Sequence, residues 1–525
     1  MKYMYIGVGG TGAKIANALT YLIASGFLKE HVNGNDVYIL LIDMDTGGGV
    51  VKHAGNALDM LKLSQNGTLP TPRIGIGNGG VRIWSPDGLT DTTTLKTLFD
   101  DGNLDDKSKK LLNSLFSGGE SHYRNPAVHY DQDITFKVGA RGQPRPGAVA
   151  WAHEYKKNSA YMSDLIRYIN PGAESMKIMF GGSLIGGTGA SAIPTVISSI
   201  YSEEIVNEAT GARTSPNKTN IDNKSWVIGM TMLQKYFDLP KKTTTQADPV
   251  LGIDSDDFHD NSRIAMMYYE DFLKENQPMV DSVYLVGVPS SQVKMMKDYE
   301  EGGTRQINFP LPAEITAAAS VMDFFKKTVD AERHEPKILY HSGFYKTPNE
   351  QENDPAIPGT LWMTFPYAVE LKRTISQLAW FSSIWADVCW DYIDTNGKKA
   401  GRLTVFDKFG RVEGMFGDIN NRNNNVNYKK AAGLYSFCNG FLSWLKELEG
   451  EGDFLIDAGP NKYNIERRRN SLEEGGLRDI SPYKKIANKI LRSAEDYNDK
   501  DINKSDDFEN VIARLWEACT GHPNR

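Results

Sequence analysis

Short apolar runs alternate with amphipathic stretches over the first part of this 525-residue chain. Six runs have the length and the continuous apolar character of buried strands: residues 3–8, 37–42, 135–138, 177–180, 226–231 and 282–286. Apolar residues at helical spacing follow several of these runs, as Ile15, Leu19 and Leu22 do after the first. This alternation predicts an α/β fold in which helices cover both faces of a parallel sheet.

The pattern changes after about residue 330. Strand-like runs at 338–343 and 360–365 precede a long amphipathic stretch, whose apolar face holds Leu371, Ile375, Leu378, Trp385, Val388 and Tyr392. Its tryptophans are predicted to be core residues. Residues 434–448 predict another packed helix, and the mixed charges of the last segment predict a solvated helical tail.

Length, charge and cysteine content narrow the class of protein. A chain of this length predicts two or three domains, because single cores stop growing near roughly 250 to 300 residues. The formal net charge of −7 gives no reason to expect nucleic acid as a partner. Three widely spaced cysteines and the lack of a long apolar run predict a cytoplasmic protein without disulfides, a zinc site or a membrane span.

Three glycine-rich turns carry the candidate chemistry. They read GVGGTG at residues 7–12, GARGQPRPG at 139–147 and GGSLIGGTGASAIP at 181–194, each after a strand-like run and before a helical stretch. Glycines allow positive φ angles and close backbone approach, and the N–H groups of a first helical turn attract anions. The turns therefore predict phosphate groups held from several sides.

Other interpretations of the turns remain open at this point. Each turn is also explained as a tight connection between a strand and a helix. The first turn, GxGxxG, equally fits an NAD- or FAD-dependent oxidoreductase. In such an enzyme the acid that binds the ribose lies about 20 residues past the glycines, whereas Asp43 lies 31 residues beyond Gly12. An oxidoreductase also leaves two of the three turns unexplained.

The order of these motifs resembles that of the tubulin/FtsZ superfamily. The first turn is similar to the family's GVGGGG loop, IDMD at 42–45 to its TDA segment, and the second turn to GAGANPxxG. GGTGASAIP at 186–194 is similar to GGTGTGAAP, and VDSVYLV at 280–286 to the VDxLIVI strand. The resemblance covers roughly residues 1–330.

This resemblance implies a division of the chain into parts. We expect a Rossmann-like nucleotide-binding domain of tubulin/FtsZ type at 1–310, with an insertion at about 50–134, and a central helix at 311–330. A smaller α+β second domain at 331–460 and a charged, mainly helical tail at 461–525 are expected to follow. The insertion is expected at the surface, because the family needs only a short connection there.

The turns and the resemblance together predict the nucleotide-binding residues. They are Gly9, Gly10, Thr11, Gly12, Lys14, Asp45, Ala140, Arg141, Gly142, Arg145, Gly186, Gly187, Thr188, Gly189 and Asn308. Lys14 would bring a cation near the phosphates, and Arg141 and Arg145 would clamp phosphate oxygens unless they are exposed loop charges. The resemblance implies that Asp45 helps to hold a metal ion or water. It places Asn308 at the base, for which helix capping is the alternative.

GTP or GDP with Mg²⁺ is the ligand that the resemblance implies. In this family an acidic loop of the next subunit orients the attacking water, so that hydrolysis depends on head-to-tail assembly. Asp330 and Glu332 are the nearest candidates for that catalytic loop. No metal site made by protein ligands alone is predicted, since the nine histidines lack ligand spacing.

The expected function is that of a prokaryotic, tubulin-like GTP-binding protein that associates with itself, into filaments, and is a possible GTPase. The insertion and the C-terminal region are candidate contacts for partner proteins. The alternative is a scaffold for partner proteins that binds nucleotide without hydrolysing it.

Overall fold

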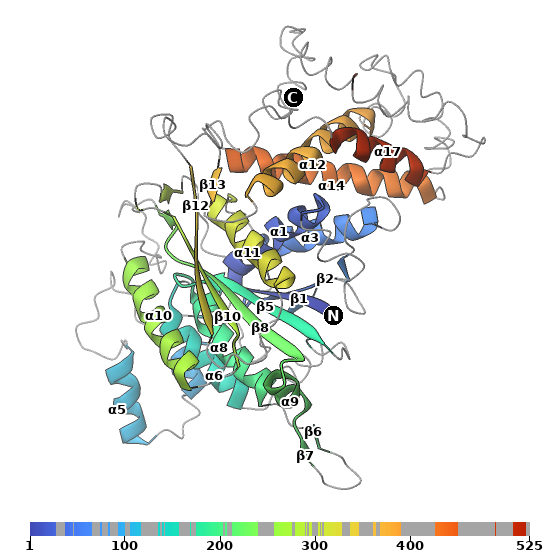
Figure 1. The fold of residues 1–525 in the computed structure, drawn as a ribbon. Coiled ribbons are helices and arrows are strands. Elements are labelled where there is room, and N and C mark those ends of the chain that lie inside the picture. Colours follow the sequence, from blue (N-terminus) through green and yellow to red (C-terminus); the bar gives the residue numbers. More distant parts are fainter. Residues whose placement is uncertain are drawn as a thin grey trace, which may run out of the picture.

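A computed structural model gives the fold of the chain (Figure 1). It describes residues 1–27, 37–45, 47–65, 74–75, 82–84, 93–99, 105–116, 135–136, 139–140, 142–156, 169, 175–202, 205–206, 213–239, 257–275, 279–288, 290, 293–296, 303–304, 306, 309–327, 336–345, 361–363, 368–389, 426–449, 489 and 508–520.

One large sheet forms the centre of the molecule (Figure 1). Its strands are β1 (Lys2–Val8), β2 (Val37–Ile42), β3 (Ile74–Gly75), β4 (Arg82–Trp84), β5 (Met176–Ser183), β8 (Trp226–Leu233), β10 (Ser282–Gly287), β12 (Lys337–Tyr345) and β13 (Leu361–Met363). In space the order is β13-β12-β10-β8-β5-β1-β2-β3, and β4 also pairs with β2. The pairs in this sheet are parallel, except that β13 is antiparallel to β12.

The direction of winding reverses between β1 and β5. The chain begins at β1, moves outward through β2 to β3 and β4, and then returns to the other side of β1 as β5. The two central strands pair with Gly7 opposite Gly181. In open parallel sheets, ligands bind at such a switch point, beyond the carboxyl ends of the strands. Two of the glycine turns follow directly from these two ends.

Two layers of helices cover one face of the sheet (Figure 1). The inner layer contains α1 (Gly9–Ala24), α3 (Gly49–Gln65) and α11 (Pro312–Lys326). The outer layer contains α12 (Ala368–Cys389), α14 (Val426–Glu449) and α17 (Phe508–Thr520). Tyr3 and Tyr5 of β1 point into this core.

The opposite face carries a second core, which receives Met4, Ile6 and Val8, the alternate residues of β1. Its helices are α4 (Leu95–Phe99), α6 (Pro144–Lys156), α8 (Gly187–Tyr201), α9 (Pro216–Asp222) and α10 (Asp257–Glu275), with α5 (Asp106–Leu115) at its margin (Figure 1). Two small ribbons pair β6 (Ile205–Val206) with β7 (Arg213–Thr214), and β9 (Phe237–Asp238) with β11 (Lys294–Met295). Alternation of the side chains of β1 between two cores is what a sheet covered on both faces requires.

The predicted parallel α/β sheet is confirmed, and five of the six predicted strands are present. The strand predicted at 135–138 is wrong over its described residues, since neither Thr135 nor Phe136 is in a strand. The side chain of Phe136 is fully buried, and its N–H donates to the carbonyl of Thr93. Phe136 therefore contributes to packing, and the strands that pair with the outer side of β2 are β3 and β4.

The expectation that residues 50–134 lie at the surface is wrong for α3. Its residues Val51, Ala54, Leu58 and Leu61 are at most 1% exposed, and the helix packs between α1 and α14. Their spacing of three or four residues forms the apolar stripe of an amphipathic helix. The segment also adds β3 and β4 to the sheet.

The predicted solvated tail is likewise wrong for α17. Ile512, Leu515, Trp516 and Cys519 are buried, and Gln377 of α12 donates to the carbonyl of Trp516 at 3.1 Å. The tryptophans of α12 are core residues, as predicted. None of the helices that the structure describes is long and apolar enough to cross a membrane.

The predicted domain boundaries stay predictions. One fact bears on how the parts connect: β12, the first strand of the predicted second domain, pairs in parallel with β10 of the large sheet. The sheet therefore continues past α11 without a break.

Candidate functional site

The turn from β1 into α1 is shaped by glycines with different surroundings. Gly9 has a φ angle of +72°, which favours glycine, and a Cβ there would lie 3.0 Å from the nitrogen of Gly189. A Cβ on Gly12 would lie 2.6 Å from the carbonyl oxygen of Gly181. A Cβ on Gly10, in contrast, would meet no atom within 4 Å. The turn is therefore packed against backbone at Gly9 and Gly12, and has open space beside Gly10.

The turn from β5 into α8 packs against the first turn. Ser183 accepts a hydrogen bond from the N–H of Gly186 at 3.1 Å, and Thr11 donates to the same hydroxyl at 3.2 Å. A Cβ on Gly189 would lie 3.1 Å from the carbonyl oxygen of Val8. The two turns therefore approach closely because glycine leaves room for backbone contact.

The second turn of the sequence, at 139–147, contacts the start of α8. Gly139 and Gly142 have φ angles of +79° and +69°. A Cβ on Gly187 would lie only 2.7 Å from the Cβ of Ala140. Asn261 of α10 donates to the carbonyl of Gly142 at 3.0 Å, which fixes the turn from outside.

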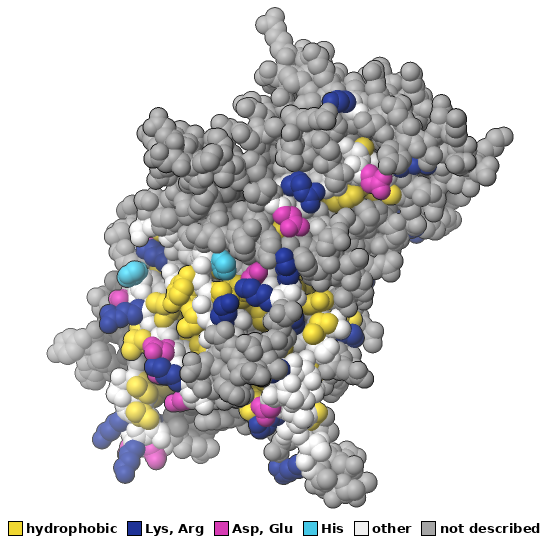
Figure 2. Space-filling model, viewed as in Figure 1, with side chains coloured by type: hydrophobic (Ala, Val, Ile, Leu, Met, Phe, Trp, Pro, Cys, Tyr) yellow, Lys and Arg dark blue, Asp and Glu magenta, His cyan; other side chains and the backbone are white. Residues whose placement is uncertain are grey.

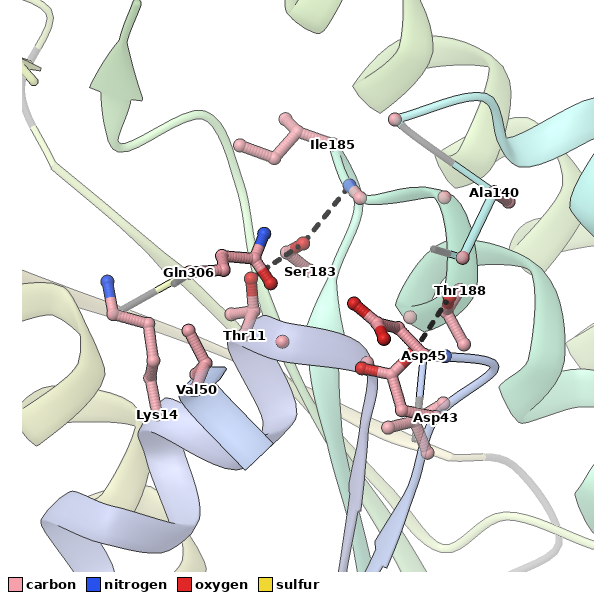
Figure 3. A pocket seen from close by; sticks show the side chains of 18 of the residues that line it. Thr11, Lys14, Asp43, Asp45, Val50, Ala140, Ser183, Ile185, Thr188 and Gln306 are labelled. Atoms are coloured by element: carbon pink, nitrogen blue, oxygen red, sulfur yellow. Dashed lines mark hydrogen bonds between the residues drawn. The ribbon is translucent and has the colours of Figure 1, made fainter. Parts of the chain in front are cut away.

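All three turns border one pocket at the carboxyl end of the sheet (Figure 3). The pocket contains about 850 Å³ of space free of protein atoms, part of it open to solvent. The residues that line it are Val8, Gly9, Gly10, Thr11, Lys14, Asp43, Asp45, Val50, Gly139, Ala140, Gly142, Ser183, Ile185, Gly186, Gly187, Thr188, Gly189, Tyr236, Phe237, Phe258, Met296 and Gln306. The three turns therefore meet at one space that opens to solvent.

Two helices begin at this pocket. The residues that precede α1 and α8 are Val8 and Gly186, and neither provides a side-chain cap. No acidic residue lies in the first turn of either helix. Uncapped N–H groups at helix N-termini carry partial positive charge and bind anions. This side of the pocket therefore attracts negative charge without using an ionised side chain.

Two carboxylates after β2 border the pocket beside the first turn of α8 (Figure 3). Asp43 accepts a hydrogen bond from Thr188 at 3.4 Å and from the N–H of Asp45 at 3.3 Å. Burial raises the pKa of Asp43 to about 7, and the neighbouring charge of Asp45 adds to the shift. Asp45 accepts from the N–H of Gly303 at 2.7 Å. Two acids beside two helix N-termini suit an anion that arrives with a cation.

A buried ion pair lies at the other end of the pocket. The Nζ of Lys14 is 2.6 Å from a carboxylate oxygen of Glu314 on α11, and both side chains are nearly inaccessible. Glu314 also accepts from Tyr236 at 3.2 Å and from the N–H of Leu311 at 2.9 Å. Burial raises the pKa of Glu314, and these partners oppose that rise. The charge of Lys14 is therefore balanced within the protein.

The structure brings most of the predicted site residues together. Thirteen of the fifteen predicted nucleotide-binding residues are described, except Arg141 and Asn308, and eleven of these line the pocket. Gly12 lies beneath the turn, where its carbonyl accepts from Tyr5. Arg145 is an exposed residue of α6 and does not line the pocket. The predicted catalytic residues Asp330 and Glu332 also lie outside the described residues.

Several pocket residues were not predicted from the sequence. Ser183 follows a glycine pair at the end of β5, a position that could have indicated it. Phe237 makes edge-to-face contacts with Tyr236 and Phe258, at centroid distances of 4.9 and 5.5 Å, and no motif marks these three residues. Gln306 reaches the pocket from the segment before α11. Among the described residues, no cluster of three acidic, histidine or cysteine side chains could hold a metal unaided.

In comparisons with known proteins, the chain matches solved structures. No protein-family model and no curated protein matches the chain. Among solved structures, CetZ from Methanosaeta thermophila strain DSM 6194 is 12% identical over 55% of this chain and 46% of that chain, with a TM-score of 0.24. CetZ2 from Haloferax volcanii, in a GTPgS-bound protofilament, is 14% identical over 67% and 70%, with a TM-score of 0.27. The chain spans less than half of the first structure, and at such low TM-scores the likeness decides nothing about function.

Proposed function

We propose that the chain binds a guanine nucleoside triphosphate with Mg²⁺ in this pocket and associates with itself in a nucleotide-dependent way, as a tubulin/FtsZ-like protein. One observation carries the proposal. Three glycine turns and two uncapped helix N-termini, from segments far apart in the sequence, border a single pocket at the switch point of the sheet. A chain of phosphates has several anionic groups for such surroundings.

The same observation disfavours a dinucleotide-dependent oxidoreductase. The doubly wound strand order is common to both classes, so the sheet does not separate them. A dinucleotide fingerprint, however, uses one glycine turn and one helix N-terminus for its pyrophosphate. Here α8 begins at the pocket as well, and Gly139 and Gly142 border it from a third side.

The acidic wall fits Mg²⁺ bound together with phosphate. Mg²⁺ prefers oxygen ligands, and in nucleotide sites it uses one or two carboxylates besides the phosphates. Asp43 and Asp45 supply carboxylate oxygens at the pocket, and burial raises the pKa of Asp43, so that a nearby cation would favour its charged form. Bound there, the ion would neutralise phosphate charge. Asp45 is the better candidate to hold it, while Thr188 positions Asp43 by donating a hydrogen bond.

Three parts of the proposal rest on the sequence resemblance: that the base is guanine, that the chain associates with itself, and that the nucleotide is hydrolysed. Gln306 lies two positions before Asn308, the predicted base-contacting residue, and it lines the pocket. Asp330 and Glu332 follow α11 and are proposed to act on the nucleotide of the next subunit. The alternative is a scaffold that binds nucleotide without hydrolysing it.

Identification of the nucleotide retained by the purified chain tests the proposal. The protein is denatured and the released small molecules are separated by chromatography against GTP, GDP, ATP, NAD and FAD standards. We expect GDP or GTP. Release of NAD or FAD would favour the oxidoreductase and overturn the proposal.

Light scattering and phosphate release, followed together while GTP is varied, test assembly and hydrolysis. Turnover that rises with protein concentration supports a site completed by a second subunit. Binding and assembly without turnover would favour the scaffold.

A further inference from the structure

The outward side of α10 carries an apolar pair between two acids. Asp260, Ile264, Met267 and Asp271 are spaced by three or four residues and therefore lie along one line of the helix. The opposite side is buried, with Phe258 in the core. Ile264 is 40% and Met267 is 58% exposed, and both acids are exposed. We call these four residues the α10 stripe.

Helix α5 carries a matching line with the opposite charge. Lys107, Leu111 and Leu115 are spaced by four residues, and the two leucines are 59% and 55% exposed. The N-terminus of the helix is capped, because the side chain of Asp105 accepts a hydrogen bond from the N–H of Ser108 at 2.7 Å. No residue of α5 itself is buried. We call Lys107, Leu111 and Leu115 the α5 stripe.

Other charges on the two helices leave this contrast in place. On α10, Lys274 pairs with Glu270 at 2.6 Å, and Arg263 is exposed beside the stripe. On α5, Asp105 and Asp106 are exposed before the stripe, and Lys109 and Lys110 are exposed beside it, so that with Lys107 the lysines outnumber the acids by three to two. The α10 stripe is therefore acidic at both ends, and the α5 stripe begins at a basic residue.

Both helices are anchored to the same face of the sheet. Phe116, which directly follows α5, belongs to the same buried cluster as Phe272 of α10. Figure 1 shows both helices at the same margin of the molecule, and Figure 2 shows hydrophobic and basic side chains exposed in this region. Contiguous apolar patches on a protein surface can mark interaction sites.

We propose that these stripes form an interface between two copies of this chain, in which α5 of one copy packs on α10 of the other. A second copy fits because the chain itself supplies both halves: each stripe has an apolar pair, and the acids of the α10 stripe are opposite in charge to Lys107 of the α5 stripe. Since each copy carries both stripes, a two-fold arrangement makes the contact twice. The interface lies outside the nucleotide pocket, so it goes beyond the proposed function and needs no nucleotide.

Charge reversal with mixing tests the interface on the full chain. One variant carries Lys107→Glu and Lys110→Glu, and a second carries Asp260→Lys and Asp271→Lys. Association without nucleotide is measured by sedimentation velocity. We expect each variant alone to bind itself about tenfold more weakly than wild type, because like charges then meet across the contact. An equal mixture of the two variants should recover most of the affinity, because opposite charges meet again.

Matched controls separate this interface from folding and from the proposed function. Lys109→Glu reverses one charge on another side of α5 and should associate like wild type. Both reversed variants should retain as much nucleotide as wild type, so loss of nucleotide would concern the pocket and not this interface. A monomeric wild type, unchanged association of both variants, or a mixture no stronger than its components would each overturn the proposal.

Discussion

The two walls of the pocket hold ligand charge by different means. On one side, the turns at Gly9 and Gly186 present backbone N–H groups at two helix N-termini, without an ionised side chain. The second wall consists of Asp43 and Asp45, which present carboxylates, and burial raises the pKa of Asp43 to about 7. The first wall favours an anion and the second a cation.

This difference indicates what the pocket is built for. The carboxylates would repel an anion that binds without a cation. The two helix N-termini, with their partial positive charge, would repel a metal ion that binds without an anion. Phosphates that carry a divalent cation satisfy both walls. The ion pair of Lys14 and Glu314 belongs to neither wall, since each charge neutralises the other.

The largest expected effect on GTP binding comes from filling the space beside the backbone N–H groups of the turn at Gly9 and Gly10. Gly10→Leu would start a side chain in open space at the pocket, because no atom lies within 4 Å of the Cβ position. We predict that affinity for GTP falls at least a thousandfold, about 4 kcal/mol, while the unfolding midpoint stays near that of wild type. Calorimetric titration and denaturant unfolding measure the two quantities.

Two other glycine variants serve as controls. Gly10→Ala adds only a methyl group and should stabilise the helix by about 0.5 to 1 kcal/mol. Gly12→Ala should lower the free energy of unfolding by about 3 kcal/mol, because its Cβ would lie 2.6 Å from a backbone oxygen. Full GTP binding by Gly10→Leu would show that the open side of the turn is not where phosphate lies.

The next largest effect concerns the ion pair. Lys14→Met leaves Glu314 buried without its partner, and we predict a loss of about 3 kcal/mol in the free energy of unfolding. The double variant Lys14→Met, Glu314→Leu should recover most of that loss, because no charge is then left unpaired. If the Lys14→Met variant is as stable as wild type but binds GTP more weakly, then Lys14 contacts the phosphates and the ion pair is not its main role.

A pH effect follows from the raised pKa of Asp43. This carboxyl keeps its proton in the folded state up to about pH 7, whereas its ordinary pKa is 3.8. The contribution of Asp43 to the free energy of unfolding is therefore fully present below pH 3.8, its ordinary pKa, and is lost as the pH rises through 7. We expect a loss on the order of 2 kcal/mol without ligand, less than the full shift because solvent enters the pocket. Asp43→Asn should remove this part of the pH dependence, and an unchanged profile would contradict the assignment.

The smallest expected effect is on how much Mg²⁺ strengthens the binding of GTP. Asp45→Asn keeps the shape and can still accept from the N–H of Gly303, but it removes one charge. We predict that Mg²⁺ then improves GTP binding about tenfold less than in wild type, about 1.4 kcal/mol, while binding without Mg²⁺ is unchanged or slightly stronger. Equal stimulation by Mg²⁺ in both proteins would place the cation elsewhere.

Local patterns in the sequence predicted the sheet and the turns well. The strands β1, β5 and β8 are continuous apolar runs, and the glycines stand where the backbone needs room or a positive φ angle. These features depend on neighbours in the chain. Their convergence on one pocket follows from parallel strands, whose carboxyl ends share one edge of the sheet.

Features that depend on distant partners could not be predicted. Lys14 was expected at the phosphates, but its partner Glu314 is three hundred positions away in the sequence. The apolar residues of α17 form a clear helical stripe, yet the surrounding charges suggested a solvated tail. β3 and β4 are only two and three residues long, too short for any periodicity to reveal.

Calorimetric titration of the nucleotide-free chain with GTP, with and without Mg²⁺, tests the central claim most directly. The two-wall pocket predicts one binding event per chain, strengthened by Mg²⁺ and abolished by Gly10→Leu. Absence of GTP binding in wild type, or equal binding by the Gly10→Leu variant, would contradict it.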